Sequence, residues 1–476
     1  MPDLGMSWEE ALAYGEETSA KSHYSKDARL MAQQKYDLGR NSSWMFTKHG
    51  VPLQIRNMEK LKQFLDAGEQ IHYQPVACYD GGDGSRTIQF FLNQIASDDA
   101  YKNVEVRTET RGVALLMSDE RTVEGIQTKG ADGLYVDISA KAVVLACGGM
   151  SNNLELLQNY SNQDLSHCVA VDQGHFGDGM VMAEQTAHGR CKTIALSSML
   201  GYVGGFHYQS FLGLAAGDNP SALFVNQMGE RFANEDVSRI TVDEKVAGVI
   251  GYSKLIEGQG VVYSVMGRGL LDYYEQNGLF NAMGFYGNGQ NEREFDLEAE
   301  LGEYADNPNM LKADTLEELA EKMNVPTDAF VSCVERYDAD AAAGAGDTLY
   351  GKDAQYMIAL DEAPYYAFKL SSLIVNTNAG IRVNENCQVV DQAFVPVKGL
   401  YASGIAISGF VTDVYEVGNC QCVSIWSGSK AARTLVEQDL GGTVADDWYG
   451  DAEWSNDDRL TFSNWDAYEE WAGKQV

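Results

Sequence analysis

Apolar residues recur three or four positions apart in several segments, and this spacing predicts amphipathic helices. Thr315 with Glu318 has the spacing of a capping box at the start of one of them, and Pro326 separates that helix from the next. Gly441 and Gly442 are predicted to end the last of these helices. The predicted helices cover residues 7–22, 25–39, 85–98, 315–325, 327–343 and 418–440.

Strand patterns lie between these helices. Residues 103–130 alternate between polar and apolar side chains and carry turn residues between their segments. Residues 142–149, "AVVLACGG", form an unbroken apolar run that ends in two glycines. Such a run is typical of a buried parallel strand whose carboxyl end meets a ligand. A hairpin is predicted over 379–391, and an apolar strand followed by glycine-rich chain over 397–409.

The composition excludes several classes of protein. The chain has 476 residues, enough for two or three domains with a large core. Its 69 Asp and Glu against 35 Lys and Arg give a net charge of −34, which repels nucleic acid and anionic membranes. No apolar run reaches the roughly 18–20 residues that a membrane helix needs. No signal peptide is visible at the start, and the compartment stays open.

Cysteine and histidine do not form metal sites in this sequence. The eight cysteines include no CxxC pair, and the seven histidines form no HxxxH or HExxH pattern. No metal is therefore expected. Cys420 and Cys422 stand one residue apart at the start of the last predicted helix, and their spacing would strain a disulfide.

Four segments, taken in order, resemble the flavoprotein subunits of the fumarate reductase and succinate dehydrogenase superfamily. They are "AVVLACGG", "GHFGDGMVMAEQTAHG", "FVNQMGERFANEDVSR", and "GLYASGIAISG" followed by "GNCQCVSIWSGSKAAR". The resemblance implies an α/β fold: an FAD-binding Rossmann-like domain with an inserted α+β capping domain. The implied division is an FAD-binding domain over 1–191 and 371–440, a capping domain over 192–370, and a tail over 441–476.

One motif of that family is missing from this chain. The G-x-G-x-x-G fingerprint, which lets a chain approach the FAD pyrophosphate at a helix N-terminus, should precede residue 40 and does not occur. The first interpretation is a truncated or mis-started sequence that lacks the N-terminal βαβ unit. The alternative is a partial, non-catalytic flavoprotein that needs a partner chain carrying this unit.

The resemblance implies reduction of an activated C=C bond, with hydride from flavin N5 and a proton from an arginine. The matching arginine is Arg268, and Glu235 and Arg239 match the family's proton relay. The alternative to a proton relay is an ordinary ion pair on the surface of one helix, because Glu235 and Arg239 are four residues apart.

Two departures bear on the substrate. Where family members that bind dicarboxylates have histidine and arginine, this chain has Asn376 and Tyr415, which offer neutral hydrogen bonds. We therefore expect an enone or enoate that is not a dicarboxylate, with Tyr415 also a candidate catalytic group. A tyrosine here also resembles flavin-dependent ketosteroid dehydrogenases, which is the alternative function. The electron donor is unidentified.

The resemblance also implies the residues that hold FAD. For Asp178, the alternative to a flavin contact is an ordinary turn before a helix. Beside Gly404, this chain has Ile405 where the family has an acidic residue. Backbone N–H groups at the start of the last helix would stabilise negative charge on the reduced ring. The expected cofactor-binding residues are Gly148, Gly149, Asp178, Gly179, Gly404, Asn419, Cys420 and Gln421.

Overall fold

The structure is a computed structural model that describes most of the chain between residues 7 and 462. It leaves out residues 1–6, 23, 25, 50–53, 56–70, 73–76, 79–83, 161–167, 171–173, 186, 188, 190, 193–195, 207–209, 239–257, 280–295, 378–379, 411–418, 451–460 and 463–476.

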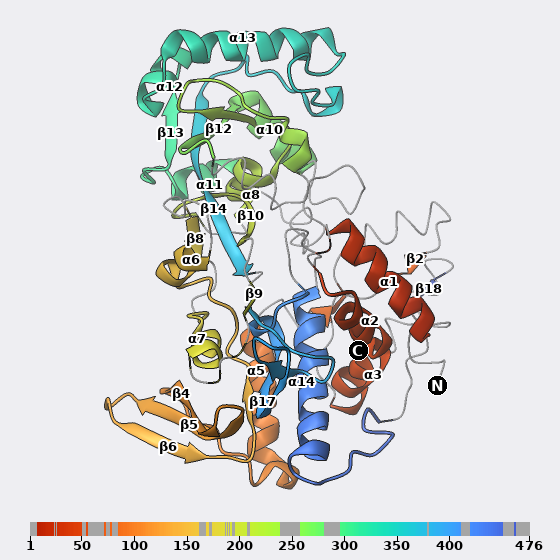
Figure 1. The fold of residues 1–476 in the computed structure, drawn as a ribbon. Helices are drawn as coiled ribbons and strands as arrows, with labels where there is room; N and C mark the ends of the chain where they lie inside the picture. Colours follow the sequence, from red (N-terminus) through yellow and green to blue (C-terminus); the bar gives the residue numbers. More distant parts are fainter. Residues whose placement is uncertain are drawn as a thin grey trace.

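Buried apolar side chains form three cores that divide the molecule into two units (Figure 1). The first core takes its residues from the ranges 30–187 and 374–431, and the elements around it form the lower unit. The other two cores take theirs from the range 203–370, and their elements form the upper unit. The division into domains at residues 191, 370 and 440 stays a prediction.

The lower unit contains a mixed sheet in which β7 pairs in parallel with β17, and β5 pairs antiparallel with both β4 and β6. The parallel pair confirms the strand predicted from "AVVLACGG". The strands are β4 (Thr110–Asp119), β5 (Thr122–Gly130), β6 (Tyr135–Ser139), β7 (Val143–Leu145), β16 (Gln388–Val390) and β17 (Pro396–Ala402), with the small pair β9 (Cys191–Lys192) and β15 (Gly380–Ile381).

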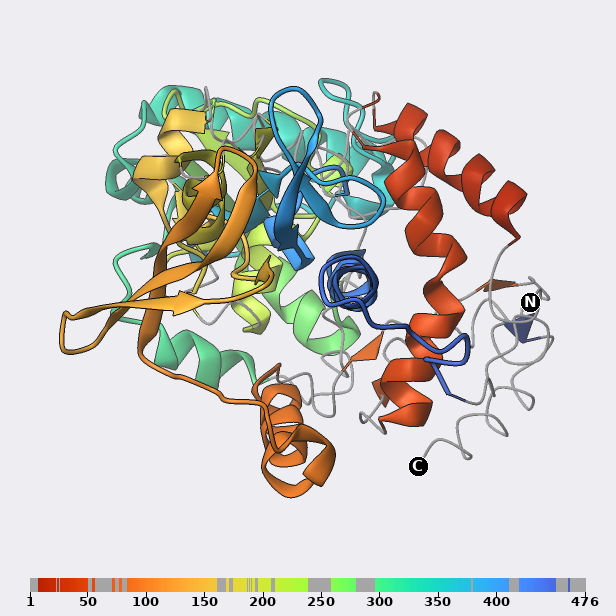
Figure 2. The ribbon, with the colours of Figure 1, turned by 60° about the horizontal axis from the view of Figure 1, so that its bottom comes forward.

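Helices α7 and α14 pack against this sheet, and α14 is the longest of those described in the lower unit. Its buried face includes Val423, Trp426 and Ala431, which belong to the first core. Figure 2 shows α14 end-on beside α2 and α3. The helices are α1 (Trp8–Lys21), α2 (Ala28–Tyr36), α3 (Leu38–Ser42), α5 (Gly84–Ser97), α6 (Leu154–Tyr160), α7 (Asp178–Gln185) and α14 (Asn419–Gln438).

The upper unit packs helices on an antiparallel sheet. Thr315 caps α12 by accepting a hydrogen bond from the Glu318 amide (3.1 Å), while the Glu318 carboxylate binds the Asp314 amide (3.2 Å). The elements are β10 (Leu196–Val203), α8 (Phe211–Asp218), β11 (Leu223–Asn226), β12 (Val262–Gly267), α10 (Arg268–Asn277), α11 (Leu297–Glu303), β13 (Met310–Ala313), α12 (Leu316–Met323), α13 (Thr327–Ala343) and β14 (Tyr365–Thr377).

Strand β14 joins the two units (Figure 1). Its first half lies between β12 and β13, and its second half lies between β10 and β8 (Cys168–Ala170). Leu370 belongs to a core of the upper unit, whereas Ile374 belongs to the core of the lower unit. A single strand therefore enters both cores.

Short elements complete the description. Strand β1 (Gln54–Ile55) pairs with β3 (Ala77–Cys78), and β2 (Ile71–His72) pairs with β18 (Thr461–Phe462). A π-helical turn covers Ser43–Lys48, and 3-10 turns cover Asp99–Tyr101, Glu235–Ser238, Ala354–Tyr356 and Gly404–Ala406.

Two expectations about local structure were wrong. Residues 103–109 were expected to be part of a strand, but β4 begins only at Thr110. Val104 and Val106 are exposed, and among the described residues no strand pairs with them. Gly39 does not end a helix, because α2 ends at Tyr36 and α3 runs through Gly39. Within the described residues, no helix combines the length and apolar character needed to cross a membrane.

Candidate flavin site and the buried charge network

The two glycines that follow β7 have no room for a side chain. A Cβ atom on Gly148 would lie 2.1 Å from the His175 ring, and one on Gly149 would lie 2.5 Å from the Thr377 hydroxyl. That hydroxyl accepts a hydrogen bond from the Met150 amide (3.3 Å). The end of β7 is thus packed directly against the end of β14.

The loop before α7 folds back onto these glycines. The Gly177 amide donates to the Gly149 carbonyl (3.0 Å), and Gly177 has a φ of 80°. A Cβ on Gly177 would lie 2.4 Å from Leu156, and one on Gly179 would lie 2.4 Å from the Cys147 sulfur. A side chain at either position would therefore meet neighbouring side chains, and the positive φ of Gly177 also favours glycine there.

Asp178 begins α7 and is paired with an arginine. The Nε atom of Arg111 donates to Oδ2 of Asp178 (2.8 Å), and this hydrogen bond, together with the charge of Asp178, raises the pKa of Arg111. A carboxylate at a helix start is favoured by the helix dipole. The structure thus gives Asp178 a local role in addition to the flavin contact that stays a prediction.

The end of β17 is joined to α14. Gly404 has a φ of 70°, and its amide donates to the Ser427 hydroxyl on α14 (2.8 Å). The Ser403 amide donates to the Leu145 carbonyl of β7 (3.0 Å). The ends of both parallel strands and one face of α14 therefore meet in one place, which is where open α/β sheets bind ligands.

The first turn of α14 contains Asn419, Cys420 and Gln421, as predicted. Asn419 is buried, and its Oδ1 accepts a hydrogen bond from Nε2 of Gln34 on α2 (2.9 Å). Gln34 was missed at the sequence level, because no local pattern links residues 385 positions apart. Cys420 and Cys422 are half-buried.

These residues fit a flat, electron-rich cofactor. Helix α14 presents amide N–H groups that have no partner within the helix. The Nδ2 atom of Asn419 is a buried donor with no partner among the described residues. FAD bound here would meet the glycine-lined strand ends and this helix start.

Arg268, the candidate proton donor, is the first residue of α10. Its guanidinium pairs with Asp272 (2.7 Å) and with Glu298 of α11 (2.6 Å). The hydrogen bond that Arg268 donates to Glu298, and then the one it donates to Asp272, raises the pKa of Arg268 despite partial burial. None of the contacts described for Arg268 involves Glu235.

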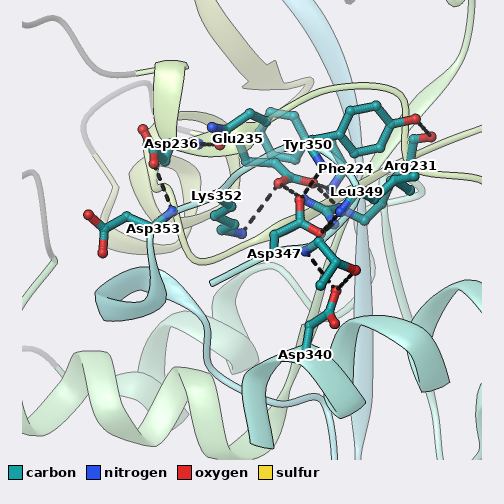
Figure 3. A network of polar contacts seen from close by, with 12 residues as sticks. Phe224, Arg231, Glu235, Asp236, Asp340, Asp347, Leu349, Tyr350, Lys352 and Asp353 are labelled. Carbon is teal, nitrogen blue, oxygen red and sulfur yellow. Dashed lines mark hydrogen bonds and ion pairs between the residues drawn. The ribbon is translucent and has the colours of Figure 1, made fainter. Parts of the chain in front are cut away.

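Glu235 instead lies at the centre of a buried charge network (Figure 3). Arg231 donates to it through two nitrogens (2.9 and 2.7 Å), Lys352 lies 3.4 Å away, and the Phe224 amide donates to it (3.1 Å). Arg231 also pairs with Asp347 (3.0 Å). Two cations and two carboxylates therefore balance inside the upper unit.

The pKa values follow from this balance. Burial alone would raise the pKa of Glu235, but the charges of Lys352 and Arg231 outweigh it and leave the pKa lowered. Burial lowers the pKa of Lys352 to about 8, although Glu235 opposes the shift. Glu235 thus stays ionised and acts as the counter-charge of both cations. Arg239, its expected relay partner, lies outside the described residues.

Of the two residues predicted to bind substrate, the structure describes the position of Asn376 but not that of Tyr415. Asn376 lies in β14 opposite Ser197 and immediately before Thr377, where the strand reaches the glycines after β7. Tyr415 lies outside the described residues. Their roles, like those of Arg268, Glu235 and Arg239, stay predictions.

Comparisons with known proteins support a flavoprotein. A family model described as FAD binding domain matches residues 5–420. Vinyl phenol reductase of Lactiplantibacillus plantarum is 28% identical over 386 residues, which is 77% of this chain and 76% of that protein. Urocanate reductase of Eggerthella lenta is 25% identical over 354 residues. The match covers 70% of this chain but only 51% of the urocanate reductase.

Solved structures share the fold. The open conformation of a flavocytochrome c3 fumarate reductase has a TM-score of 0.64 at 20% identity, covering 91% of this chain and 68% of that chain. The 3-ketosteroid delta1-dehydrogenase of Sterolibacterium denitrificans has a TM-score of 0.60 at 16% identity, covering 90% and 89%. These likenesses confirm the α/β FAD-binding fold.

Replacing Gly177 tests the close packing at the strand ends. Gly177→Ala should lower the free energy of unfolding by about 1–2 kcal/mol for the left-handed backbone and by about 1–3 kcal/mol more for the clash with Leu156. Gly133→Ala is the matched control, since Gly133 has the same φ of 80° but no atom near its Cβ position. Denaturant unfolding measures both, and equal losses would contradict this assignment.

Replacing Glu235 tests the buried network. Glu235→Gln should lower the free energy of unfolding by about 3–5 kcal/mol, because Arg231 and Lys352 would lose their shared carboxylate. Glu318→Gln, which removes an exposed pair with Lys322, should have little effect. An unchanged unfolding midpoint for Glu235→Gln, with activity lost, would instead favour the relay role.

Proposed function

This chain belongs to the FAD-binding domain family and is an FAD-dependent oxidoreductase related to fumarate reductases, and we propose that it reduces an activated C=C bond. The substrate we propose is an enone, an enoate or a vinyl phenol, and not a dicarboxylate. The electron donor is a separate, unidentified reductant.

The observation that carries this proposal is the residue at position 376. Strand β14 brings Asn376 to the junction of the upper and lower units, one residue before Thr377, whose hydroxyl accepts a hydrogen bond from the Met150 amide just after the glycines that follow β7. An asparagine there is neutral, whereas a carboxylate needs a cation or several N–H donors. Tyr415, which precedes the helix start of α14 in the sequence, is also neutral. A substrate with two carboxylates would lack its counter-charges.

The vinyl phenol reductase agrees with this choice of substrate class, whereas several other relatives are fumarate reductases. Vinyl phenol reductase acts, by its name, on an alkene that carries no carboxylate, and it is matched over three quarters of its length. The chain spans about half or less of other curated relatives, among them a probable fumarate reductase of Shewanella frigidimarina. Their activities therefore serve only as a guide to the reaction.

Within this proposal, bound FAD, once reduced by the electron donor, would supply the hydride for one carbon of the double bond. Arg268 donates the proton to the neighbouring carbon. In the present arrangement two carboxylates hold its guanidinium and raise its pKa. To act as an acid, Arg268 has to exchange at least one of them for the substrate, and Glu298, which is largely exposed, is the easier to leave.

A flavin-dependent ketosteroid-type dehydrogenase is the second candidate. The fold likeness to the Sterolibacterium enzyme and the tyrosine at position 415 favour it. Oxidation of a 3-ketosteroid with a dye as electron acceptor would then exceed alkene reduction with a low-potential donor.

A substrate panel tests the proposal. Purified protein with FAD and reduced methyl viologen should reduce a vinyl phenol or a simple enone and leave fumarate unreacted. The double variant Asn376→His with Tyr415→Arg should gain fumarate reduction and should bind fumarate at least about tenfold more tightly than the unaltered protein, because one buried charged hydrogen bond contributes about 1.5–3 kcal/mol. Fumarate turnover by the unaltered protein would contradict the proposal, as would a protein that takes up no FAD.

Arg268→Ala tests the proton donor. The variant should lose alkene reduction by a factor of about 10²–10⁴, the usual contribution of general acid catalysis, and should retain its flavin absorbance. Glu298→Gln is the companion variant: it removes one carboxylate that raises the pKa of Arg268 and should preserve turnover. Retained turnover in Arg268→Ala would remove this residue from its role.

A further inference from the structure

Polar contacts join α14 to the helices beside it. Nε2 of Gln34 donates to Oδ1 of Asn419 (2.9 Å), and the Trp426 indole donates to Asp37 (3.3 Å). Farther along α14, the Ser429 hydroxyl donates to Oδ1 of Asn41 (2.5 Å). These three contacts follow one another along α14, at Asn419, Trp426 and Ser429. The Gln34 contact is the one at the N-terminus of α14.

The Gln34–Asn419 contact is incomplete. Two carboxamides can exchange two hydrogen bonds, but here only one is formed. Oε1 of Gln34 and Nδ2 of Asn419 are both buried and have no partner among the described residues. Gln34 is 0% and Asn419 6% exposed, so bulk water does not satisfy them. Buried polar groups are normally paired, so an unpaired acceptor and an unpaired donor on two carboxamides that are bonded to each other point to a missing polar group.

The chemistry of that group follows from the two atoms. A donor beside an acceptor complements an edge that presents an acceptor beside a donor. The pyrimidine edge of a flavin has this pattern, with a carbonyl oxygen next to the N3–H group. The start of α14 favours the same electron-rich edge, because its N–H groups and its dipole attract negative charge.

We propose that Gln34 and Asn419 together recognise the pyrimidine edge of the flavin. Asn419 donates from Nδ2 to a ring carbonyl, and Gln34 accepts from N3–H at Oε1. Gln34 is also a positioning residue, because its Nε2 bond to Asn419 Oδ1 turns the Asn419 amide so that Nδ2 faces the ring. This inference rests on the placement of FAD at the start of α14, and not on the identity of the alkene.

Binding of a modified flavin tests the inference without any turnover. N3-methyl FAD lacks the N3–H donor, so the unaltered protein should bind FAD about fivefold to tenfold more tightly than N3-methyl FAD. Gln34→Leu should weaken FAD binding and bring the two dissociation constants within about twofold. Quenching of flavin fluorescence measures each constant.

Two further variants separate recognition from packing. Ser429→Ala removes a hydrogen bond from the same helix interface, away from the start of α14, and should keep the preference for FAD. Gln34→Glu keeps an acceptor but removes the donor that orients Asn419, so it should keep part of the preference and bind FAD more weakly than the unaltered protein.

The outcomes are distinct from those of the substrate panel. Gln34→Leu with an unchanged preference for FAD over N3-methyl FAD would overturn the inference, as would equal binding of the two flavins by the unaltered protein. A protein that shows the predicted preferences but reduces no alkene would support this inference and contradict the proposed reaction.

Discussion

The pairing of β14 on both edges is the constraint on which the rest of the structure depends. Its thirteen residues, Tyr365–Thr377, lie between β12 and β13 at one end and between β10 and β8 at the other. Every strand of the upper sheet is therefore placed, directly or through β12, by this one strand. Thr377 at its end contacts Gly149, so the upper sheet is fixed relative to the carboxyl end of β7.

This arrangement explains why the two units contribute different chemistry. The lower unit brings strand ends, glycines and the start of α14 together, and backbone groups dominate there. The upper unit contributes ionised side chains. In its Arg231–Glu235–Asp347–Lys352 network every charge has a partner. Because the network is buried, removing one member would leave an unpaired buried charge and lower the stability of the protein. We interpret that network as the support of the upper unit.

The helix pair α2 and α14 supplies the second connection within the lower unit. Asp37 accepts from the Trp426 indole and lies 3.7 Å from Arg433, so this interface has its own buried polar contacts. Such contacts set the rotation of α14 about its axis, because a carboxylate and an indole N–H must face each other to bond. The orientation of Asn419 depends on that rotation.

Much of the fold and part of the candidate site could be read from local sequence. The apolar run 142–149 was predicted as a parallel strand, and β7 confirms it. The helix that begins at Asn419 was also predicted. Both follow from patterns within about twenty residues. Residues 103–109 show the limit of such patterns: they alternate like a strand, but a strand forms only where a neighbour accepts its hydrogen bonds.

The sequence by itself indicated several of the helices, among them α12, α13 and α14, and that positions 376 and 415 are neutral, but it did not indicate α8, α10 or α11. Tertiary structure alone decided the partners. It paired Glu235 with Arg231 and Lys352 rather than with Arg268, and it placed Gln34 against Asn419. The physical reason is that a charge or an amide bonds to whichever group the packed chain brings within about 3 Å, and that choice depends on contacts between distant segments.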